Sequence, residues 1–283
     1  MVSKEFHPSP LRYPGGKACL LDSIKVIIDE NDIHGIEYAE PFAGGAGLAL
    51  SLLFEGYVSQ IFLNDLDTAV FAFWSSLLED SDALCSLIER TPVTIENWHR
   101  QKRILSNPSD YSLLELGFAT FFLNRTNRSG IILGGIIGGH NQEGDYRLDC
   151  RFNKDNLKAK IQKIASWKDC IFLTRFDGCE FIEEVICNNP RSCFTFIDPP
   201  YYKKGPQLYY NSFDHVDHQD LAKLIQNFLP GPWIVTYDDV PEIRSMYALS
   251  PEVPYEINYS LAQKRKGREV MFHSRNLSVP SFI

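Results

Sequence analysis

One short stretch of the sequence joins a buried strand to groups that can bind an amine. The β-rich run from Cys193 to Ile197 ends in Asp198-Pro199-Pro200-Tyr201. Two prolines supply no backbone donors and cannot continue a sheet interior, so the strand should end by placing Asp198 in a cleft. The prolines also hold their neighbours extended, which fixes the Asp198 carboxylate relative to the Pro199 carbonyl.

This pair of acceptors suits a planar base that carries an exocyclic amine. The amine has two hydrogens to donate, to Asp198 and to the Pro199 carbonyl, and the ring has a π face for stacking on Tyr201. Such hydrogen bonds would localise the nitrogen lone pair and stabilise a positive charge arriving on it. Asp198, Pro199, Pro200 and Tyr201 are therefore candidate catalytic residues. The simpler interpretation is a strand-ending turn, because Asp and Pro are ordinary turn residues.

Length and composition indicate a globular protein. The chain has 283 residues, of which 44% are hydrophobic, enough for one large domain or a core with an insertion. Residues 1–10 lack an apolar stretch long enough for a signal peptide, and no run of 18 uncharged apolar residues follows, so a soluble, cytoplasmic protein is expected. The seven cysteines form no Cys-x-x-Cys pair, which predicts neither disulfides nor structural zinc.

Charge is distributed unevenly along the chain. The formal net charge of −8 argues against a simple polyanion binder, but residues 100–163 hold 11 Lys/Arg against 6 Asp/Glu. This basic island is suited to nucleic-acid phosphates. It is also compatible with a solvated face that is merely basic.

The first glycine turn lies at Tyr13–Lys17 (Tyr-Pro-Gly-Gly-Lys) and precedes apolar residues at helical spacing. Such a turn presents backbone N–H groups to an anion, and Lys17 adds a positive charge beside them. A phosphate-binding P-loop is excluded, because Leu11 takes the first glycine position and Ala18 follows the lysine. The expected anion is a carboxylate.

The second glycine turn, Glu40–Gly47 (Glu-Pro-Phe-Ala-Gly-Gly-Ala-Gly), separates a predicted strand at 36–39 from a helix at 48–54. Glycines let the backbone approach a ligand closely, although some such turns serve only packing. The next strand ends at Asp65, about 20 residues further on, where a ribose-binding carboxylate is expected. Asp65 could instead cap the helix near Ala69, a role that Asp67 could also fill.

Strand–helix alternation lapses between residues 69 and 151. Predicted helices at 70–78 and 113–123 lead into 124–130 (Asn-Arg-Thr-Asn-Arg-Ser-Gly), two apolar runs and a hairpin-like turn at 140–145. Arg and Asn are well suited to reading purines, and Arg also neutralises phosphates. Arg125, Asn127 and Arg128 are therefore candidates for base or phosphate contact. The alternative is that they cap and pair within the hairpin.

The alternation resumes after residue 152. Helices are predicted at 153–165, 180–186, 218–229 and 240–248, and strands at 171–175, 193–197, 233–237, 255–260 and 269–273. Asp177 follows one strand as a third acid on the cleft side. The pattern predicts an α/β, Rossmann-like fold with a seven-stranded, mostly parallel sheet and an antiparallel final pair. Residues 1–68 would form the cofactor-binding part of the catalytic domain, 69–151 a helical and hairpin recognition insertion, and 152–283 the remainder.

Other kinds of chemistry find little support in the sequence. The acid and histidine run at 214–220 lacks a recognised metal spacing, and Asp217 is a natural N-cap for the following helix. Neither a Gly-x-Ser-x-Gly elbow nor a His-Glu-x-x-His helix is present, so hydrolase chemistry is not indicated. No metal site is predicted.

The two glycine turns, Asp65 and the Asp198–Tyr201 tetrad together resemble the Dam-type (alpha-group) site-specific DNA adenine methyltransferases, over nearly the whole chain. The resemblance implies a Rossmann-like enzyme that transfers a methyl group from S-adenosyl-L-methionine to N6 of an adenine flipped out of double-stranded DNA. No membrane partner is expected, and a monomer is expected, with a dimer as the alternative. The implied cofactor-binding residues are Tyr13, Gly15, Gly16, Lys17, Glu40, Pro41, Phe42, Gly44, Gly45, Asp65, Asp177 and Asp198. The candidate DNA-binding residues are Arg125, Asn127, Arg128, Lys203, Lys264 and Lys266.

The chain departs from the family pattern at the recognition hairpin. Many relatives carry Asn-Gly-Leu-x-Arg, where this chain has Ser-Gly-Ile-Ile-Leu at 129–133, so the guanine-reading arginine is absent. GATC is therefore not assumed as the target. Three alternatives stay open at this point: an RNA adenine methyltransferase, a DNA cytosine-N4 methyltransferase with the same tetrad, and a non-catalytic DNA-binding relative.

Overall fold

The structure is a computed structural model that describes residues 7–13, 15–189, 191–203, 213–259 and 265–280; of 257–259, 265 and 266 it describes the backbone alone. The chain divides into two compact units, each described here by itself. Unit 1 comprises Met1–Gly15 and Asp67–Asp169, and unit 2 comprises Gly16–Leu66 and Cys170–Ile283.

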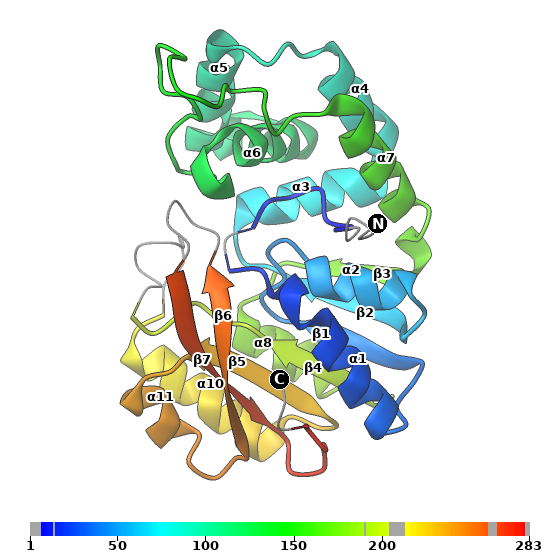
Figure 1. The fold of residues 1–283 in the computed structure, drawn as a ribbon. Coiled ribbons are helices and arrows are strands. Elements are labelled where there is room, and N and C mark those ends of the chain that lie inside the picture. The colour runs from blue at the N-terminus through cyan, green and yellow to red at the C-terminus, as the bar shows by residue number, and fades with distance from the viewer. Residues whose placement is uncertain (1–6, 14, 190, 204–212, 260–264, 281–283) are drawn as a thin grey trace, which may run out of the picture. The chain divides into compact units, whose positions relative to one another are not determined.

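Unit 2 is built on a seven-stranded sheet with the strand order β3-β2-β1-β4-β5-β7-β6 (Figure 1). The strands are β1 (Ile36–Glu40), β2 (Val58–Asn64), β3 (Ile171–Thr174), β4 (Cys193–Ile197), β5 (Trp233–Asp238), β6 (Glu252–Tyr259) and β7 (Arg265–His273). Strands β1 to β5 pair in parallel, and β7 pairs antiparallel with both β5 and β6. The predicted seven-stranded, mostly parallel sheet with an antiparallel final pair is confirmed.

The strand order reverses between β1 and β4, which are direct neighbours. The chain runs outward through β2 and β3 on one side and through β4 and β5 on the other. Ala39 of β1 lies opposite Thr195 of β4, so the residues that follow these strands come to the same edge of the sheet. In open α/β sheets this switch point, at the carboxyl ends of the strands, is where ligands bind.

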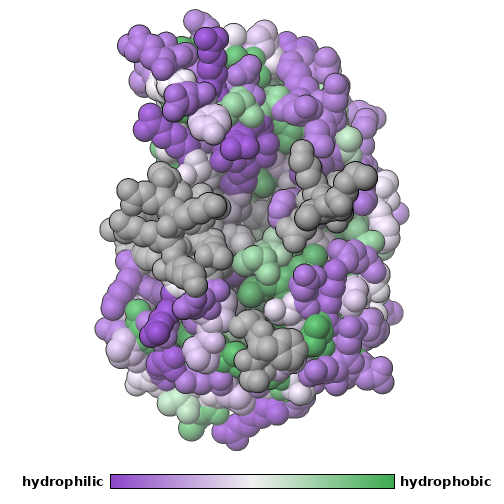
Figure 2. Space-filling view, viewed as in Figure 1, coloured by the Kyte–Doolittle hydropathy of each residue, from purple (hydrophilic) through white to green (hydrophobic). Residues whose placement is uncertain are grey.

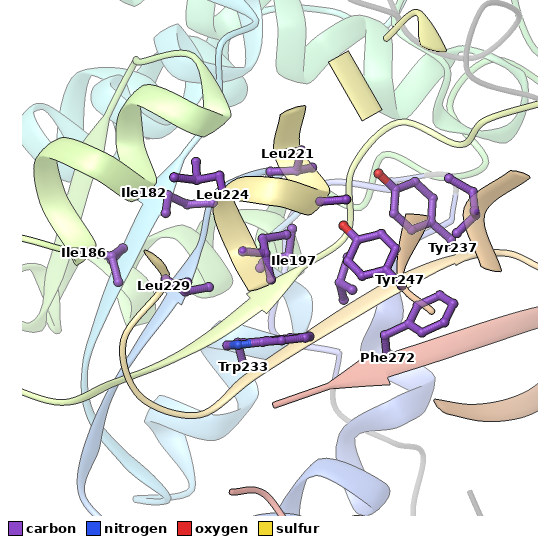
Figure 3. Packing of buried hydrophobic residues seen from close by; sticks show 14 of the residues in the cluster. Ile182, Ile186, Ile197, Leu221, Leu224, Leu229, Trp233, Tyr237, Tyr247 and Phe272 are labelled. Atoms are coloured by element: carbon purple, nitrogen blue, oxygen red, sulfur yellow. The ribbon is translucent and has the colours of Figure 1, made fainter. Parts of the chain in front are cut away.

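Helices cover both faces of the unit 2 sheet (Figure 1). The 3₁₀ turn η1 (Lys17–Leu20), α1 (Leu21–Glu30) and α2 (Gly47–Phe54) belong to one layer, and α8 (Gly178–Phe181), α10 (His215–Phe228) and α11 (Pro241–Met246) to the other. The second layer packs into a core with alternate residues of the strands, such as Ile197, Val235 and Phe272 (Figure 3). This fully buried core fixes the strand ends that carry the candidate site.

Unit 1 is helical and includes two helices that the sequence did not predict, α4 and α5. Its helices are α3 (Thr68–Glu79), α4 (Ser81–Arg90), α5 (Ile95–Ser106), α6 (Leu113–Thr126) and α7 (Lys154–Ala165). Helices α3 and α6 approach closely at Gly117, where an added Cβ would lie 2.4 Å from the Ala72 carbonyl oxygen. Helix α6 begins with a capping box formed by Ser112 and Glu115.

Two local predictions were wrong. Helix α10 begins at His215, not at residue 218, and its N-cap is Asp214; Asp217 sits three residues later and completes a capping box with Asp214. The predicted hairpin at 140–145 is not flanked by strands in the described part of the chain, where residues 131–152 form turns with one isolated bridge between Asn127 and Ile136. Side-chain hydrogen bonds from Gln142 to the carbonyls of Ile137 and Gly139 hold this segment instead.

Candidate active site

Asp198 directly follows β4 at the switch point, and its carboxylate is held on both oxygens. The ammonium group of Lys17 donates to Oδ1 and Oδ2 at 2.8 Å each, and the Thr236 hydroxyl donates to Oδ1 at 2.9 Å. The Asp198 side chain is 21% exposed, whereas that of Lys17 is 3% exposed. The strand end thus presents a fixed carboxylate that is accessible from one side.

Opposing influences set the pKa of Asp198. Burial raises it above its ordinary value, Lys17 lowers it, and the carboxylate of Glu269 raises it. The net direction is upward. Lys17 is the main group that opposes this rise, and the ionised form of the carboxylate that it favours is an acceptor on both oxygens.

Tyr201 is buried beside this pair, which corrects its expected role as a stacking surface. Its residue is 2% exposed, and its hydroxyl accepts from Lys17 at 2.8 Å and donates to Glu269. Glu269, on β7, also accepts from the Tyr255 hydroxyl and lies 3.9 Å from the Lys17 ammonium. A ring enclosed to this degree offers no open face to a base in this conformation. Tyr201 acts here through its hydroxyl.

The prolines and the residues after the tetrad are fixed by β5. Pro199 and Pro200 are buried, and Asp238 at the end of β5 accepts from the backbone N–H groups of Tyr202 and Lys203, at 3.0 and 3.2 Å. Lys203 itself is exposed. Because the neighbouring strand anchors the chain on the far side of the tetrad, the Pro199 carbonyl is held in a defined position.

Glu40 ends β1 inside the protein, next to buried Pro41. It accepts from the Tyr38 hydroxyl at 3.1 Å and from the Ala49 N–H at 3.2 Å. Burial raises the pKa of Glu40 to about 8, and the charge of Asp198 contributes to the rise. Glu40 is thus mostly protonated at neutral pH.

This shift predicts how stability depends on pH. A carboxyl group whose pKa is raised on folding stabilises the native state below its unfolded pKa, and that stability is lost as pH rises through the folded pKa. The Glu40→Gln variant should therefore lose less stability than the wild type between about pH 5 and pH 8. Denaturant unfolding across this range measures the difference. Equal slopes for the two proteins would contradict the prediction.

The glycine turn after β1 is tied to the end of β2. Gly44 and Ala46 adopt positive φ values of 47° and 46°, and the Gly44 N–H donates to Asp65 Oδ2 at 2.8 Å. Gly45 is buried in the same turn. The helix cap that Asp65 could have provided belongs to Asp67, which accepts from the N–H groups of the first turn of α3. Asp65 therefore lies at the glycine turn, where its carboxylate is bound to the backbone of Gly44.

A buried side chain, Asn64, joins the ends of three strands. Its amide donates to the carbonyls of Pro41 and Phe176 at 2.9 and 3.0 Å, and it accepts from the Phe176 N–H and the Thr174 hydroxyl at 2.8 and 2.9 Å. All four bonds of the amide are satisfied within the sheet edge. Asn64 thereby fixes the loop before Asp177 relative to the glycine turn.

Asp177 caps α8, and the Phe42 ring packs against the first residue of that helix. Asp177 is the N-cap of α8 and accepts from the Cys179 N–H at 2.9 Å. The half-buried ring of Phe42 lies against Gly178, where an added Cβ would come within 2.3 Å of the ring. A glycine is required here because the aromatic ring occupies the space of a side chain.

These groups fit the cofactor that the sequence resemblance implies. A backbone turn with positive φ values, a carboxylate at the end of β2 and an aromatic ring packed on a glycine can hold an anionic end, ribose hydroxyls and an adenine ring, respectively. They lie in unit 2 with Lys17 and Asp198. Phe42, Gly44, Asp65 and Asp177 therefore stay candidates for residues that would hold S-adenosylmethionine. Gly16 is exposed before η1, whereas Tyr13 and Gly15 belong to unit 1.

The DNA-binding candidates of unit 1 differ in what they can reach. Asn127 is fully buried: it accepts from the Trp98 indole at 2.7 Å and donates to the carbonyls of Ile131 and Ile132 at 3.0 and 2.8 Å. Its expected contact with a base is wrong for this conformation, because the amide holds the loop together. Arg128 is exposed.

Arg125 is also used within unit 1. Its guanidinium donates to the Arg151 carbonyl through Nε at 2.7 Å and to the Pro10 carbonyl at 3.5 Å. Burial, together with the charges of Arg12 and Arg151, lowers the pKa of Arg125 to about 10. The face of the molecule in Figure 2 is mostly hydrophilic over α5 and α6. Lys264 and the side chain of Lys266 lie outside the described residues.

Sequence reasoning missed the side chains that hold the site in place. Thr236 and Glu269 lie within predicted strands that were given no role in the site, Asp238 directly follows one of them, and Asn64 was read only as part of a strand. A signal was present for two of them: Glu269 is a lone acid at the start of an apolar run, and Asp238 ends a buried strand. Their partners could not be identified without the strand order.

Within the described residues, no group of three or more His, Cys, Asp or Glu side chains could hold a metal ion, and no helix is long and apolar enough to cross a membrane. All seven cysteines are unpaired.

Comparisons with known proteins place the chain in a family. Among solved structures, it is similar to a protein of Pyrococcus horikoshii described as an RNA methyltransferase (12% identity, 93% of this chain and 85% of that chain, TM-score 0.45). It is also similar to the rRNA methyltransferase AviRa of Streptomyces viridochromogenes (12%, 93% and 86%, TM-score 0.41). A search of curated proteins found no match. The model of the D12 class N6 adenine-specific DNA methyltransferases matches residues 13–260. The chain therefore belongs to this family of S-adenosylmethionine-dependent enzymes.

Proposed function

We propose that the protein is a site-specific DNA methyltransferase that methylates N6 of an adenine flipped out of duplex DNA. The observation that carries this proposal is the Asp198 carboxylate, fixed by Lys17 and Thr236 at the end of β4 and followed at once by two buried prolines. This arrangement holds a charged acceptor and a carbonyl acceptor on adjacent residues, one for each hydrogen of an exocyclic amine.

The two oxygens of Asp198 are not equivalent. Among the described contacts, Oδ1 accepts from both Lys17 and Thr236, whereas Oδ2 accepts from Lys17 alone. A carboxylate oxygen has two lone-pair sites, so Oδ2 keeps capacity for one more donor. We assign Oδ2 as the acceptor for one amine hydrogen and the Pro199 carbonyl as the acceptor for the other.

Both hydrogen bonds strengthen as positive charge develops on the amine nitrogen. The adenine amine is a weak nucleophile because its lone pair is delocalised into the ring. Acceptors on both hydrogens favour the form in which the pair is localised and the nitrogen is becoming cationic, so catalysis is electrostatic and needs no strong base. S-adenosylmethionine supplies the electrophilic methyl group, and residues of unit 2 orient the donor and the amine for transfer.

The DNA must present its target outside the helical stack. An amine that pairs within a duplex is inaccessible to Asp198, so the adenine has to be extruded into the site. Exposed basic side chains such as Arg128 and Lys203 are available for phosphates, and the contribution of each such contact should fall as salt rises. We propose these two residues, together with Lys264 and Lys266, as DNA contacts.

The substrate proposal is tested with S-adenosylmethionine labelled in its methyl group. Unmethylated genomic DNA, the same DNA denatured, and total RNA are each incubated with the protein, digested to nucleosides and separated. We expect label in N6-methyldeoxyadenosine from duplex DNA. Label found only in RNA, or in N4-methyldeoxycytidine, would overturn the proposal. Sequencing of the methylated positions then gives the target site.

The oligomeric state and the cellular location of the enzyme are part of the same proposal. We propose a monomer that acts in the cytoplasm. Light scattering after size-exclusion chromatography should give the mass of one 32.3 kDa chain. A mass of two chains would establish the dimer instead.

A further inference from the structure

A buried carboxylate on the last strand is connected to the site through one hydroxyl group, that of Tyr201. Glu269 lies on β7, opposite Asp238 of β5 and Tyr255 of β6, and it is fully buried. Its Oε1 accepts from the Tyr201 hydroxyl and its Oε2 from the Tyr255 hydroxyl. Two donors on two oxygens suit a carboxylate, which accepts on both. Glu269 lies beyond the segment 13–260 that the family model matches.

The hydrogen bonds that link Glu269 to Asp198 through Tyr201 and Lys17 run in a defined direction. A phenol has one hydrogen, so a Tyr201 hydroxyl that donates to Glu269 turns its lone pairs toward the Lys17 ammonium, 2.8 Å away. The ammonium has three hydrogens and meets three acceptors at 2.8 Å: the two oxygens of Asp198 and the Tyr201 hydroxyl. The orientation of each donor therefore depends on the acceptor beyond it.

We propose that Glu269 is a positioning residue for methyl transfer, which acts through the Tyr201 hydroxyl to hold the Lys17 ammonium against Asp198. The inference rests on the proposed function, since it concerns the carboxylate that would bind the amine. Without an acceptor at Glu269, the Tyr201 hydrogen can turn toward Lys17, and a hydroxyl that points its hydrogen at an ammonium repels it. Lys17 would then lose its hydrogen bond to the Tyr201 hydroxyl and its fixed place.

Two other effects of Glu269 must be separated from positioning. One is direct repulsion: the charge of Glu269 raises the pKa of Asp198 through space. The other is a purely structural role in joining β7 to β6. The charged and titratable groups that interact with Asp198 or belong to its network include Lys17 and Cys19 from η1, Tyr38 and Glu40 from β1, Tyr201 after β4, Tyr255 from β6 and Glu269 from β7.

A double-mutant cycle distinguishes positioning from the other two effects. Glu269→Met, which removes both acceptor oxygens at nearly the same volume, Tyr201→Phe and the double variant are compared in kcat and KM across pH. Hydrogen bonds to charged groups are strong enough that Glu269→Met should lower kcat about 10- to 100-fold. In the Tyr201→Phe background the same change should have much less effect, because the hydroxyl that transmits it is absent. The acid limb of the kcat profile should move to higher pH as Lys17 loosens.

Each alternative predicts a different outcome. If the fold-losses in kcat of the two single variants multiply in the double variant, Glu269 does not act through Tyr201. That result would overturn the proposal. An acid limb that moves to lower pH would identify Glu269 as a repelling charge, since removal of a like charge lowers the pKa of Asp198. Glu37→Met is the matched control: it alters another buried carboxylate of the same sheet, bound to Arg191 and Asn189 away from the site. It should leave kcat unchanged.

A readout independent of activity separates this inference from the proposed function. An immobilised, buried ammonium exchanges its hydrogens slowly, so its ¹H–¹⁵N signal is observable by NMR. We expect the Lys17 Nζ signal in the wild type and its broadening in both Glu269→Met and Tyr201→Phe. A sharp signal that persists in both variants would refute the positioning role, even if methyl transfer to DNA is confirmed. A broadened signal would support it, even if the substrate proves to be RNA.

Discussion

Replacing Asp198 with asparagine is expected to lower kcat for methyl transfer by about a hundred- to a thousand-fold, the effect of removing one electrostatic contact to a transition state. The amide has the shape of the carboxylate but only one acceptor oxygen and no charge, so it cannot stabilise positive charge on the amine. Its NH₂ group also faces the Lys17 ammonium. Transfer of labelled methyl under single-turnover conditions measures the change.

The control for this variant is Asp214→Asn. Asp214 caps α10 and is exposed, and asparagine is an equally good N-cap, so both stability and kcat should match the wild type. S-adenosylmethionine binding by Asp198→Asn, measured by calorimetry, shows whether the site is still assembled. Undiminished turnover by Asp198→Asn would contradict the proposed mechanism.

Replacing Lys17 with methionine should impair both activity and stability. The side chain is 3% exposed and separates the carboxylates of Asp198 and Glu269, so its loss leaves two buried acids facing each other. Breaking a buried ion pair by removing one partner costs about 3–5 kcal/mol of unfolding free energy. Denaturant unfolding and labelled-methyl transfer measure the two effects.

The Lys17→Met variant should also respond differently to pH. Without the ammonium, the pKa of Asp198 rises further, because burial and Glu269 both raise it and Lys17 lowers it. A raised carboxyl pKa means that stability is lost as pH rises through it, so the variant should lose more stability than the wild type as pH rises above the ordinary pKa range of an aspartate. Lys25→Met removes a lysine paired with Glu55 and 19% exposed, and should cost at most about 1 kcal/mol. Equal losses for both variants would contradict the buried-pair interpretation.

The sequence was sufficient to locate the strand ends that carry chemistry. Asp198, Glu40 and Asp65 each follow a short apolar run, and a carboxyl group at the end of a buried strand is visible in the local pattern. Parallel topology then predicts that such residues share one edge of the sheet. For the same reason, the seven strands and the antiparallel final pair were correctly predicted.

Residues whose role depends on distant partners could not be predicted in the same way. Glu269 belongs to the site only because β7 inserts between β5 and β6, and neither its neighbours nor its spacing specify that position. Tyr201 and Asn127 were misjudged for a related reason: both side chains have polar groups suited to a ligand, but burial and internal partners already satisfy them. The start of α10 was misplaced because two aspartates, at 214 and 217, can each cap a helix.

The position of Glu269 has a consequence for the comparison of genomes. A relative identified only by the segment equivalent to 13–260 could carry every recognised motif and still have lost the acid on its final strand. We expect such a gene product to bind its substrates and turn them over slowly. Inspection of that one strand would separate relatives with fast turnover from those with slow turnover before any is purified.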